Sequence, residues 1–293
     1  MKIFFIGTVS FSLKALEKLV SLNAEIVGVA TKSKSTFNSD HEDLSPICTA
    51  NNIPFKYVKD INAPHIITWI KSLNPDVIFC FGWSSLIKNE LLNLTEMGVI
   101  GFHPTELPKN RGRHPLIWAI VLGLKETTTT FFFMGEGADD GDILSQSSLS
   151  INYEDDALDV YKKMEETAIF QIEKFLPELV NGTYRRMNQD HSLSNNWRKR
   201  GMKDGEIDFR MSSYAIYNLV RGLTKPYIGA HLFYNQQEVK VWKVREEETK
   251  FSNFESGKIL EVVNGEILVK TYDKAIRILD HNFQTLPTKG EYL

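Results

Sequence analysis

The sequence predicts an α/β fold: a doubly wound, mainly parallel, Rossmann-like sheet followed by a smaller antiparallel, β-barrel-like (OB-like) domain. Two observations support this prediction. In the first part of the chain, short apolar runs alternate with segments of helical spacing, which is typical of parallel sheets with right-handed crossovers. After about residue 190, turn residues separate runs that alternate between apolar and polar positions, which is typical of antiparallel strands. We therefore expect one domain over residues 1–190 and a second over 191–293.

Short apolar runs that suit burial on both faces predict the strands of the first domain. They are KIFFIG (2–7), EIVGVAT (25–31), DVIFCFG (76–82), GVIGFH (98–103) and TTTTFFFM (127–134). Apolar residues at helical spacing predict the helices. These are FSLKALEKLV (11–20), PHIITWIKSL (64–73), SSLIKNELLNL (84–94), PLIWAIVLG (115–123) and a long amphipathic helix over 155–180. Ser10 or Ser12 is the expected cap of the first helix.

The second domain is predicted to contain one helix and five strands. A polar, turn-rich stretch, SLSNNWRKRGMKDGEID, precedes a helix over 212–222. The expected strands are GAHLFYN, EVKVWKV, GKILEVV, EILVKTY and AIRILDH. The turn VNGE between two of them is a hairpin signal. Together these runs indicate a small antiparallel barrel or sheet of about 80–90 residues.

The composition is that of an ordinary globular protein. The chain has 293 residues, 42% hydrophobic and 24% charged, with a formal net charge of −3, which argues against a general nucleic-acid binder. No apolar run approaches the ~20 residues that span a membrane, and the first run is too short for a signal peptide. Cys48 and Cys80 lack disulfide or metal spacing and are expected to be reduced, partly buried thiols. We therefore expect a cytoplasmic location, and an oligomer is compatible with the sequence.

A stiff polar loop follows the predicted strand 98–103. The segment GFHPTELPKNRGRHP (101–115) contains three prolines, two histidines and four basic residues. Ligands of open α/β sheets bind beyond the carboxyl ends of the strands, so we expect His103 to lie at the mouth of a site. The prolines restrict the loop backbone, Gly112 lets the chain turn, and the basic residues offer contacts to an anion. The basic residues meant here are Lys109, Arg111 and Arg113.

A glycine-rich acidic loop, GEGADDGDIL (135–144), follows the strand 127–134, and we expect it at the same sheet edge. A histidine and a carboxylate would then meet, which is the minimum set for proton transfer. A metal site built from His103, His114 and the aspartates is an alternative, although no HxH or HExxH spacing supports it. The chain contains neither a GxSxG elbow nor a GxGxxG or P-loop motif, which makes hydrolase, dinucleotide and P-loop interpretations weak.

Several stretches resemble the formyltransferase family that uses 10-formyltetrahydrofolate. They are FFIGTVSFSLKALEKL, GFHPTELPKNRGRHPLIWAI and MGEGADDGDIL. In addition, KDGEIDF followed by AIYNLVRGLTKPYIGAHLFYN is similar to the carboxyl-terminal half of methionyl-tRNA formyltransferases and of sugar-nucleotide N-formyltransferases. The resemblance covers almost the whole chain. It implies a folate-dependent transferase that uses 10-formyltetrahydrofolate as co-substrate and requires no metal.

The resemblance also implies roles for individual residues. His103 and Asp139 match the family's catalytic histidine and aspartate, where the histidine handles the proton of the attacking amine. A segment that contacts the pterin through backbone groups matches Ser85, Leu86 and Ile87. For Leu86 and Ile87, a helix face packed on the sheet is the alternative. The folate site is completed by Arg113 and by the loop Gly135, Glu136, Gly137, Ala138 and Asp139. Contacts to the second substrate are expected from Thr8, Ser10, Lys109, Asn110 and Arg111.

The sequence departs from the family pattern at Gly101, where the family has an asparagine two residues before the histidine. That asparagine is expected to donate a hydrogen bond to the oxyanion, and losing one such donor costs about 2.7–4 kcal/mol. Either the chain is a weakened or silent homologue, or another donor replaces the asparagine. We hypothesise that Asn110, His114 or a backbone N–H does so, and that Gly101 leaves room for it.

The charge pattern favours a small anionic substrate over tRNA. Phosphate contacts dominate nucleic-acid affinity and need a basic surface, whereas residues 200–293 contain 14 Lys and Arg against 13 Asp and Glu. A nucleotide-linked amino sugar needs only a few cations for its diphosphate, such as Lys109 or Arg111. Bacterial sugar N-formyltransferases that resemble this chain make formamido deoxy sugars for surface glycans, including those of the pseudaminic-acid type. Methionyl-tRNA formyltransferase is the alternative.

Overall fold

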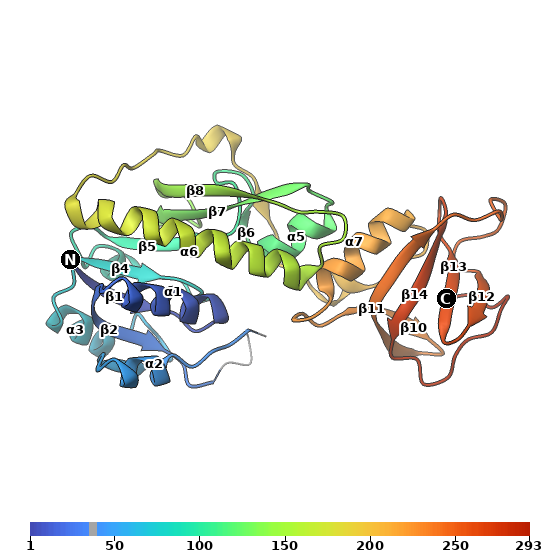
Figure 1. Cartoon of the computed structure of the whole chain (residues 1–293), viewed down its shortest axis with the longest axis horizontal. Coiled ribbons are helices and arrows are strands. Elements are labelled where there is room, and N and C mark those ends of the chain that lie inside the picture. Colours follow the sequence, from blue (N-terminus) through green and yellow to red (C-terminus); the bar gives the residue numbers. More distant parts are fainter. Residues whose placement is uncertain (35–39) are drawn as a thin grey trace. The chain divides into compact units, whose positions relative to one another are not determined.

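The computed structural model describes residues 1–34 and 40–293 and divides the chain into two compact units (Figure 1). The first unit contains Met1–Gly112, Thr127–Leu149 and Lys162–Trp197. The second contains Arg113–Glu126, Ser150–Tyr161 and Arg198–Leu293. Each unit is therefore assembled from segments that are distant in the sequence, and a single domain boundary at residue 190 stays a prediction.

The first unit is built on a seven-stranded sheet in the order β3-β2-β1-β4-β5-β7-β8. The strands are β1 (Lys2–Ile6), β2 (Glu25–Thr31), β3 (Phe55–Tyr57), β4 (Val77–Cys80), β5 (Val99–His103), β7 (Glu126–Phe133) and β8 (Ile143–Ser150). Strands β1 to β5 pair in parallel, and β7 runs antiparallel to β5. The predicted mainly parallel sheet is confirmed. Strand order changes direction around β1 and β4, the place where such sheets bind ligands.

Helices cover both faces of this sheet (Figure 1). On one face, α1 (Ser10–Ser21) and α6 (Ala157–Asn181) contribute residues such as Leu16 and Phe175 to a core with the phenylalanines of the strands. On the other face, α3 (Pro64–Ser72) and α4 (Asn89–Leu92) pack against a second cluster around Phe4 and Ile78. Burial on both faces explains why the strands are continuously apolar. The short helix α2 (Ser45–Ala50) places Cys48 in the first core.

The second unit contains a five-stranded antiparallel sheet in the order β10-β11-β14-β13-β12. The strands are β10 (Ala230–Tyr234), β11 (Gln237–Glu247), β12 (Ile259–Val263), β13 (Glu266–Lys270) and β14 (Ala275–His281). The helices α5 (Pro115–Val121) and α7 (Ser213–Leu223) belong to the same unit, and Ile117 and Leu219 join its core. The predicted antiparallel strands are confirmed. Short 3₁₀ turns occur at His191–Leu193 and Met202–Gly205.

Two sequence-based predictions about the first unit are wrong. The helix expected over 84–94 is helical only at Asn89–Leu92, because the side chain of Asn62 bonds the backbone of Leu86 and Lys88 and holds this segment as a loop. The strand 127–134 also runs opposite to the expected direction. Thr130 lies beside His103, and Phe133 lies beside Ile100. Segment 104–125 returns the chain to the sheet edge where β5 ended, so β7 starts there. Strand β8 was not expected at all.

Both cysteines are free and buried. Burial raises the pKa of the Cys80 thiol to about 12 and, with the charge of Asp43, raises the pKa of Cys48 to about 12. Both thiols are therefore protonated and poorly reactive at neutral pH. Within residues 1–34 and 40–293, no helix has the length and apolar character needed to cross a membrane.

Candidate active site

His103, the last residue of β5, is almost fully buried, and its two ring nitrogens have different neighbours. Nε2 lies 3.0 Å from the main-chain oxygen of Asn110. A carbonyl oxygen can only accept, so Nε2 carries the hydrogen and donates it. Nδ1 lies 3.7 Å from Asp139 Oδ2. In the neutral ring Nδ1 therefore holds the free lone pair, and it is the atom that can take up and release a proton.

Asp139 is held from two sides although it lies in a long loop. Its Oδ2 accepts a hydrogen bond from the Gly112 N–H at 3.0 Å, and its main-chain oxygen accepts one from Gln189 Nε2 at 2.9 Å. Its backbone has a positive φ of 53°, a conformation that aspartate tolerates better than most residues. The carboxylate is thereby fixed beside His103. The structure brings together the histidine and the aspartate that the sequence predicted as partners.

The sheet edge alone does not explain this meeting. Because β7 is antiparallel to β5, the loop after β7 begins beside Ile100, three residues before His103. The loop must then travel back along β5 to bring Asp139 to the histidine. Gln189 assists by also donating to the Gly141 oxygen at 2.6 Å. The expectation that both loops leave one carboxyl edge is wrong, while the predicted pairing of the two side chains is present.

Gly112 supports Asp139 and has no possible substitute in this conformation. It lies in β6 (Arg111–Gly112), which pairs with β9 (Asn196–Trp197). Its φ is +105°, and a Cβ there would lie 2.3 Å from the Trp197 main-chain oxygen. Only glycine permits both this backbone and this close approach. The sequence prediction that Gly112 allows a turn is correct, and its N–H additionally orients the carboxylate.

The predicted folate segments contact one another through a pair of polar side chains. Asn89 Nδ2 donates to Glu136 Oε1 at 2.7 Å, which links the segment after Ser85 to the loop 135–139. Ile87 is buried, whereas Leu86 is 71% exposed and lies outside any helix. The helix-face alternative is therefore wrong for Leu86. An apolar side chain held out from a fixed backbone is available to a ligand.

Gly135 and Gly137 have an internal reason to be glycines. A Cβ at either position would lie within 2.6 Å of an Asp140 carboxylate oxygen, so Asp140 folds back over this part of the loop. Ala138 lies in the same turn. Within the described residues, the buried Oδ1 of Asp140 has no hydrogen-bond partner. The loop is compact and polar, and its shape does not depend on a ligand.

Two residues expected to contact the second substrate serve the protein's own structure. Arg111 is buried, and its guanidinium donates to Gln189 at 2.6 Å and lies 3.0 Å from His191 Nδ1. Its charge is therefore engaged inside the unit, and the role in anion binding finds no support. Asn110 donates its main-chain N–H to Asn195 at 2.8 Å and accepts from His103. It positions the histidine through its backbone.

The other expected substrate contacts lie apart from that pair. Lys109 remains half exposed and forms an ion pair with Glu106 at 3.3 Å. Thr8 Oγ1 lies 2.9 Å from His41 Nδ1, and Ser10 donates to Glu165 at 3.0 Å. At the start of α1, Ser12 accepts from the N–H groups of Thr8 and Val9, so Ser12 rather than Ser10 satisfies that end of the helix.

The space beside Gly101 is filled by another side chain. A Cβ at this position would lie 2.8 Å from Met134 Cγ and 3.2 Å from Phe132 Cε1. The hypothesis that Gly101 leaves room for a replacement donor is therefore wrong, because Met134 occupies that room. Asn110 uses its backbone on His103 and Asn195, as described above. The exchange of asparagine for glycine is coupled to packing from β7.

Arg113 and His114 belong to the second unit, among further cations. Burial lowers the pKa of His114, and the nearby charges of Arg200, Arg113 and Lys199 lower it further. His114 is therefore neutral at pH 7. Arg200 and Arg198 lie over the Trp118 ring at 4.5 and 5.3 Å. Within the described ranges of both units, no cluster of three or more His, Cys, Asp or Glu side chains is arranged to hold a metal.

The residues that support the site were not apparent from the sequence. Asn62, Asn89, Gln189 and Asn195 each fix a loop of the site through a side-chain amide. They lie in segments distant from the two motifs, and an isolated Asn or Gln carries no recognisable pattern. Only the tertiary structure reveals them.

Comparison with known proteins places the chain in a family. Residues 1–174 match the formyl transferase family and residues 201–288 match its C-terminal domain family. A methionyl-tRNA formyltransferase of Clostridioides difficile is 32% identical over 100% of this chain and 96% of its own length. The bifunctional polymyxin resistance protein ArnA of Wigglesworthia glossinidia brevipalpis is 30% identical over 92% of this chain and 41% of that protein.

Solved structures share the fold at lower identity. WlaRD, a sugar 3N-formyl transferase solved with dTDP and 5-N-formyl-THF, has a TM-score of 0.73 at 18% identity, covering 98% of this chain and 99% of that one. The N-formyltransferase of Helicobacter canadensis, in complex with folinic acid and dTDP-3-aminofucose, has 0.73 at 19%, covering 96% and 100%. The sequence matches, the two-part fold and the His103–Asp139 pair agree: the chain belongs to the formyltransferase family.

Proposed function

We propose that the protein transfers the formyl group of 10-formyltetrahydrofolate to the amine of a nucleotide-linked amino deoxy sugar in the cytoplasm. A bacterial surface-glycan pathway, such as one of the pseudaminic-acid type, is the proposed context. The observation that carries the reaction type is the approach of His103 Nδ1 to Asp139 Oδ2 at 3.7 Å. A buried imidazole with one nitrogen fixed as donor and the other facing a carboxylate is suited to general acid–base catalysis.

The proposed chemistry needs one proton carrier. The sugar amine forms a C–N bond to the formyl carbon and gives up a proton to His103 Nδ1. Asp139 stabilises the imidazolium, and Asn110 keeps the ring in place through Nε2. His103 then releases the same proton to the departing nitrogen as the old C–N bond breaks, so charge and atoms balance. The co-substrate supplies the one-carbon unit, and proximity of the two reactants supplies much of the acceleration.

The donor is proposed to lie against two segments of the first unit. The backbone of Ser85 to Ile87 is fixed by Asn62, and Asn89 links it to Glu136 in the loop that ends at Asp139. Exposed Leu86 offers an apolar contact for the ring system of a folate. Arg113 remains a proposed folate contact on the basis of the motif. We propose that no metal takes part.

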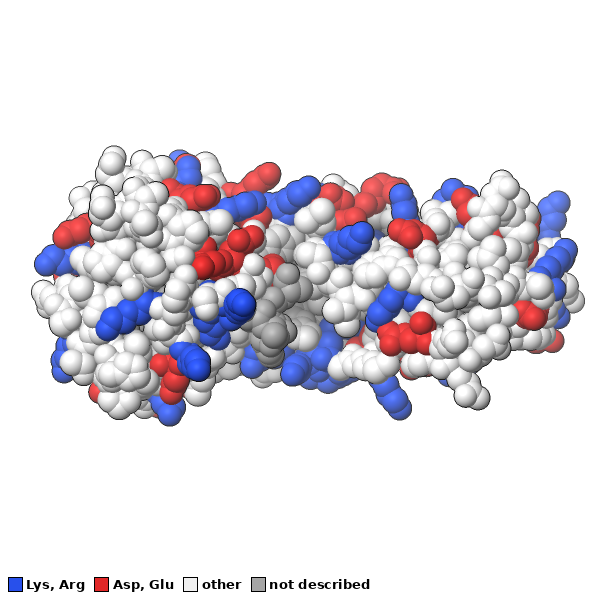
Figure 2. Space-filling model, turned by 90° about the horizontal axis from the view of Figure 1, so that it is seen from below, with Lys and Arg blue, Asp and Glu red and all other residues white. Residues whose placement is uncertain are grey.

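The charge distribution supports a small acceptor. Residues 200–293 carry 14 Lys and Arg and 13 Asp and Glu. On the face seen in Figure 2, basic and acidic side chains of the described residues are interspersed and do not form a continuous basic area. A tRNA-binding surface needs many cations facing phosphates. Since Arg111 is engaged internally, Lys109 is the motif cation proposed to meet the diphosphate.

Methionyl-tRNA formyltransferase is the second candidate because of a specific observation. The relative from Clostridioides difficile is 32% identical over the whole chain. The two candidates share donor and chemistry and differ in acceptor, so acceptor competition separates them.

The deciding assay supplies 10-formyltetrahydrofolate with either a panel of nucleotide-linked amino sugars or methionyl-tRNA, and mass spectrometry identifies the formylated product. We expect a formamido sugar nucleotide and unmodified tRNA. Formylated methionyl-tRNA alone would establish the second candidate. If neither acceptor is formylated while folate still binds, the chain is a silent homologue.

A further inference from the structure

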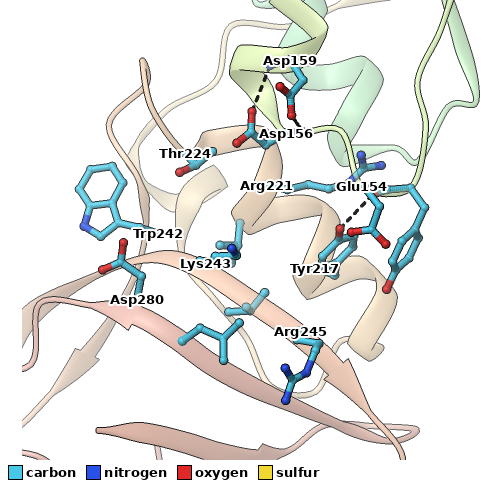
Figure 3. Close-up of a pocket in the computed structure, with 14 residues that line it drawn as sticks. Glu154, Asp156, Asp159, Tyr217, Arg221, Thr224, Trp242, Lys243, Arg245 and Asp280 are labelled. Atoms are coloured by element: carbon cyan, nitrogen blue, oxygen red, sulfur yellow. Dashed lines mark hydrogen bonds between the residues drawn. The ribbon is translucent and has the colours of Figure 1, made fainter.

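The second unit contains a cavity of about 760 Å³ that is lined only by its own residues (Figure 3). Strands β11 and β14 form one side, and α7 together with the segment 153–159 forms the other. Figure 3 shows Trp242 and Asp280 at one end and Tyr217 and Glu154 at the other. A volume of this size is ordinary for a small-molecule site.

Irregular strand pairing directs an unusual set of side chains into this cavity. In a regular strand, neighbouring residues point to opposite faces. Here four consecutive residues, Trp242 to Arg245, all line the cavity. The register between β11 and β14 shifts twice at this place, on either side of Lys243, which lies opposite Asp280. Such bulges redirect side chains and are frequent next to functional sites.

The indole of Trp242 is held in one orientation at the cavity. Its Nε1 donates to Asn282 Oδ1 at 2.9 Å. Gly229, with a φ of +79°, lies against the six-membered ring, because a Cβ there would be 2.9 to 3.2 Å from three successive ring atoms. A larger residue at position 229 would displace the indole. The ring is therefore a fixed apolar plate, which costs a ligand little ordering when it stacks there.

The charges around this plate are of both signs, and most are already engaged. Arg221 donates to the main-chain oxygen of Asn152 at 3.0 Å and to Asn218 at 2.8 Å. Arg245 pairs with Glu247 at 2.7 Å. Among the described residues, the side chains of Lys243 and Asp280 have no ion pair or hydrogen bond. One free donor group and one free acceptor group therefore lie next to the indole.

The same charges decide which ligand fits. Four carboxylates line the cavity, namely Glu154, Asp156, Asp159 and Asp280. With Arg221 and Arg245 engaged, these carboxylates repel a phosphate group. An apolar ligand would leave the polar lining without partners. A hydroxyl both donates and accepts, so a ring with several hydroxyls satisfies Lys243, Asp280 and Thr224 together.

We propose that this cavity binds a saccharide ring stacked on Trp242, with its hydroxyls bonded to Lys243, Asp280 and Thr224. The site is separate from His103, because every residue that lines it belongs to the second unit. The saccharide is either free or the sugar part of a nucleotide sugar. Binding here does not require that the proposed formyl transfer be correct.

The test follows the indole N–H signal of Trp242 by NMR in ¹⁵N-labelled protein. The chain has five tryptophans, and the Trp242→Phe variant assigns the signal. The probes are methyl fucoside, dTDP and dTDP-3-aminofucose. We expect methyl fucoside to shift the Trp242 signal saturably. A shift with the nucleotide sugar but not with methyl fucoside identifies the nucleotide-linked source. No shift with either saccharide, or an equal shift with dTDP alone, overturns the proposal.

Matched variants separate recognition from unfolding. Trp242→Ala should weaken saccharide binding about tenfold, measured by calorimetry, because it removes the stacking surface. Tyr272→Ala removes an aromatic side chain of the same unit that is 77% exposed and does not line the cavity, and it should bind as the unchanged protein does. Gly229→Ala keeps the indole but displaces it, and should weaken binding as well. Equal affinity in Trp242→Ala and Tyr272→Ala contradicts the proposal.

A third comparison distinguishes this site from the proposed active site. His103→Ala should lose formyl transfer and keep the Trp242 response to methyl fucoside. If formyl transfer is absent in every assay while the Trp242 signal still shifts, the proposed function fails and this site stands. If His103→Ala abolishes the Trp242 response in folded protein, the proposed independence of the two sites is wrong.

Discussion

The two nitrogens of His103 determine what the site can do at the scale of single residues. Asn110 accepts from Nε2 and so leaves Nδ1, facing Asp139, as the proton-transferring atom. The sequence motif identified both side chains. It did not identify which nitrogen acts, because that depends on a backbone oxygen seven residues further along the chain.

The first prediction concerns this pair. His103→Ala and Asp139→Asn should each lower turnover at least about 100-fold, since positioned proton transfer contributes that much or more. Both variants should keep the far-ultraviolet circular dichroism and thermal midpoint of the unchanged protein within a few degrees. Steady-state rates with saturating donor measure the effect. Unchanged turnover in either variant removes that residue from the mechanism.

The second prediction concerns the missing asparagine. Gly101→Asn should lower the free energy of unfolding by about 1–3 kcal/mol, because the new side chain meets Met134 and overpacks a filled space. It should not raise turnover. Urea unfolding and a rate assay measure the two effects. The double variant Gly101→Asn, Met134→Ala supplies the control and should recover much of the stability. A large gain in turnover by Gly101→Asn alone would show that the space is open after all.

At the scale of elements, the short strand pair β6–β9 connects packing to chemistry. It places Gly112 against Trp197, and the Gly112 N–H orients the Asp139 carboxylate. The active-site loop therefore depends on a segment more than 80 residues away in sequence, which explains why the supporting residues escaped a motif search.

The third prediction tests that connection. Gly112→Ala should lower both stability and turnover, since alanine is strained at φ +105° and its Cβ would meet the Trp197 oxygen at 2.3 Å. Gly182→Ala is a matched control in the same unit, with φ +68° and no atom within 4 Å of the added Cβ. It should cost only about 1 kcal/mol of backbone strain. Thermal unfolding and turnover of both variants decide the point. Equal behaviour would contradict the proposed support of Asp139.

The fourth prediction concerns the sheet of the second unit. Arg277 binds Glu247 through two nitrogens, at 2.7 and 3.0 Å. The Arg277 hydrogen bonds hold the pKa of Glu247 below its ordinary value. Because the folded pKa is the lower one, the unfolded chain binds more protons, and this stabilisation is present above about pH 4.3 and lost as pH falls through the folded pKa.

Arg277→Met should therefore lower the free energy of unfolding at pH 7 by about 1–3 kcal/mol, and stability should fall less steeply below about pH 4.3 than in the unchanged protein. Urea unfolding across this range measures both. The exposed Lys289→Met exchange serves as a charge-matched control. Parallel pH profiles for Arg277→Met and the unchanged protein would show that the pair contributes nothing.

At the scale of the whole molecule, the near balance of charges bears on the acceptor. The net charge is −3 over 293 residues, and the described surface in Figure 2 mixes both signs. Long-range attraction of a polyanion is therefore weak, while a few local cations suffice for a diphosphate.

The fifth prediction follows from this balance. Raising salt from 50 to 200 mM should lower kcat/KM for a nucleotide sugar by less than about tenfold, whereas a nucleic-acid acceptor with 6–10 phosphate contacts loses about 10³–10⁵ in affinity. Initial rates at fixed donor concentration measure the slope. The folate concentration dependence, measured in parallel, controls for general salt effects. A slope of the steep kind would favour the tRNA acceptor.

The sequence by itself determined the class of fold, the strands of both parts and the identity of the central pair. Periodicity is local, and the motif around His103 and Asp139 is contiguous enough to be recognised. The direction of β7, the loop at Ser85, the filling of the Gly101 space by Met134 and the internal engagement of Arg111 were decided only by the tertiary structure. Each depends on a partner from a distant segment, and such contacts leave no period or spacing in the chain.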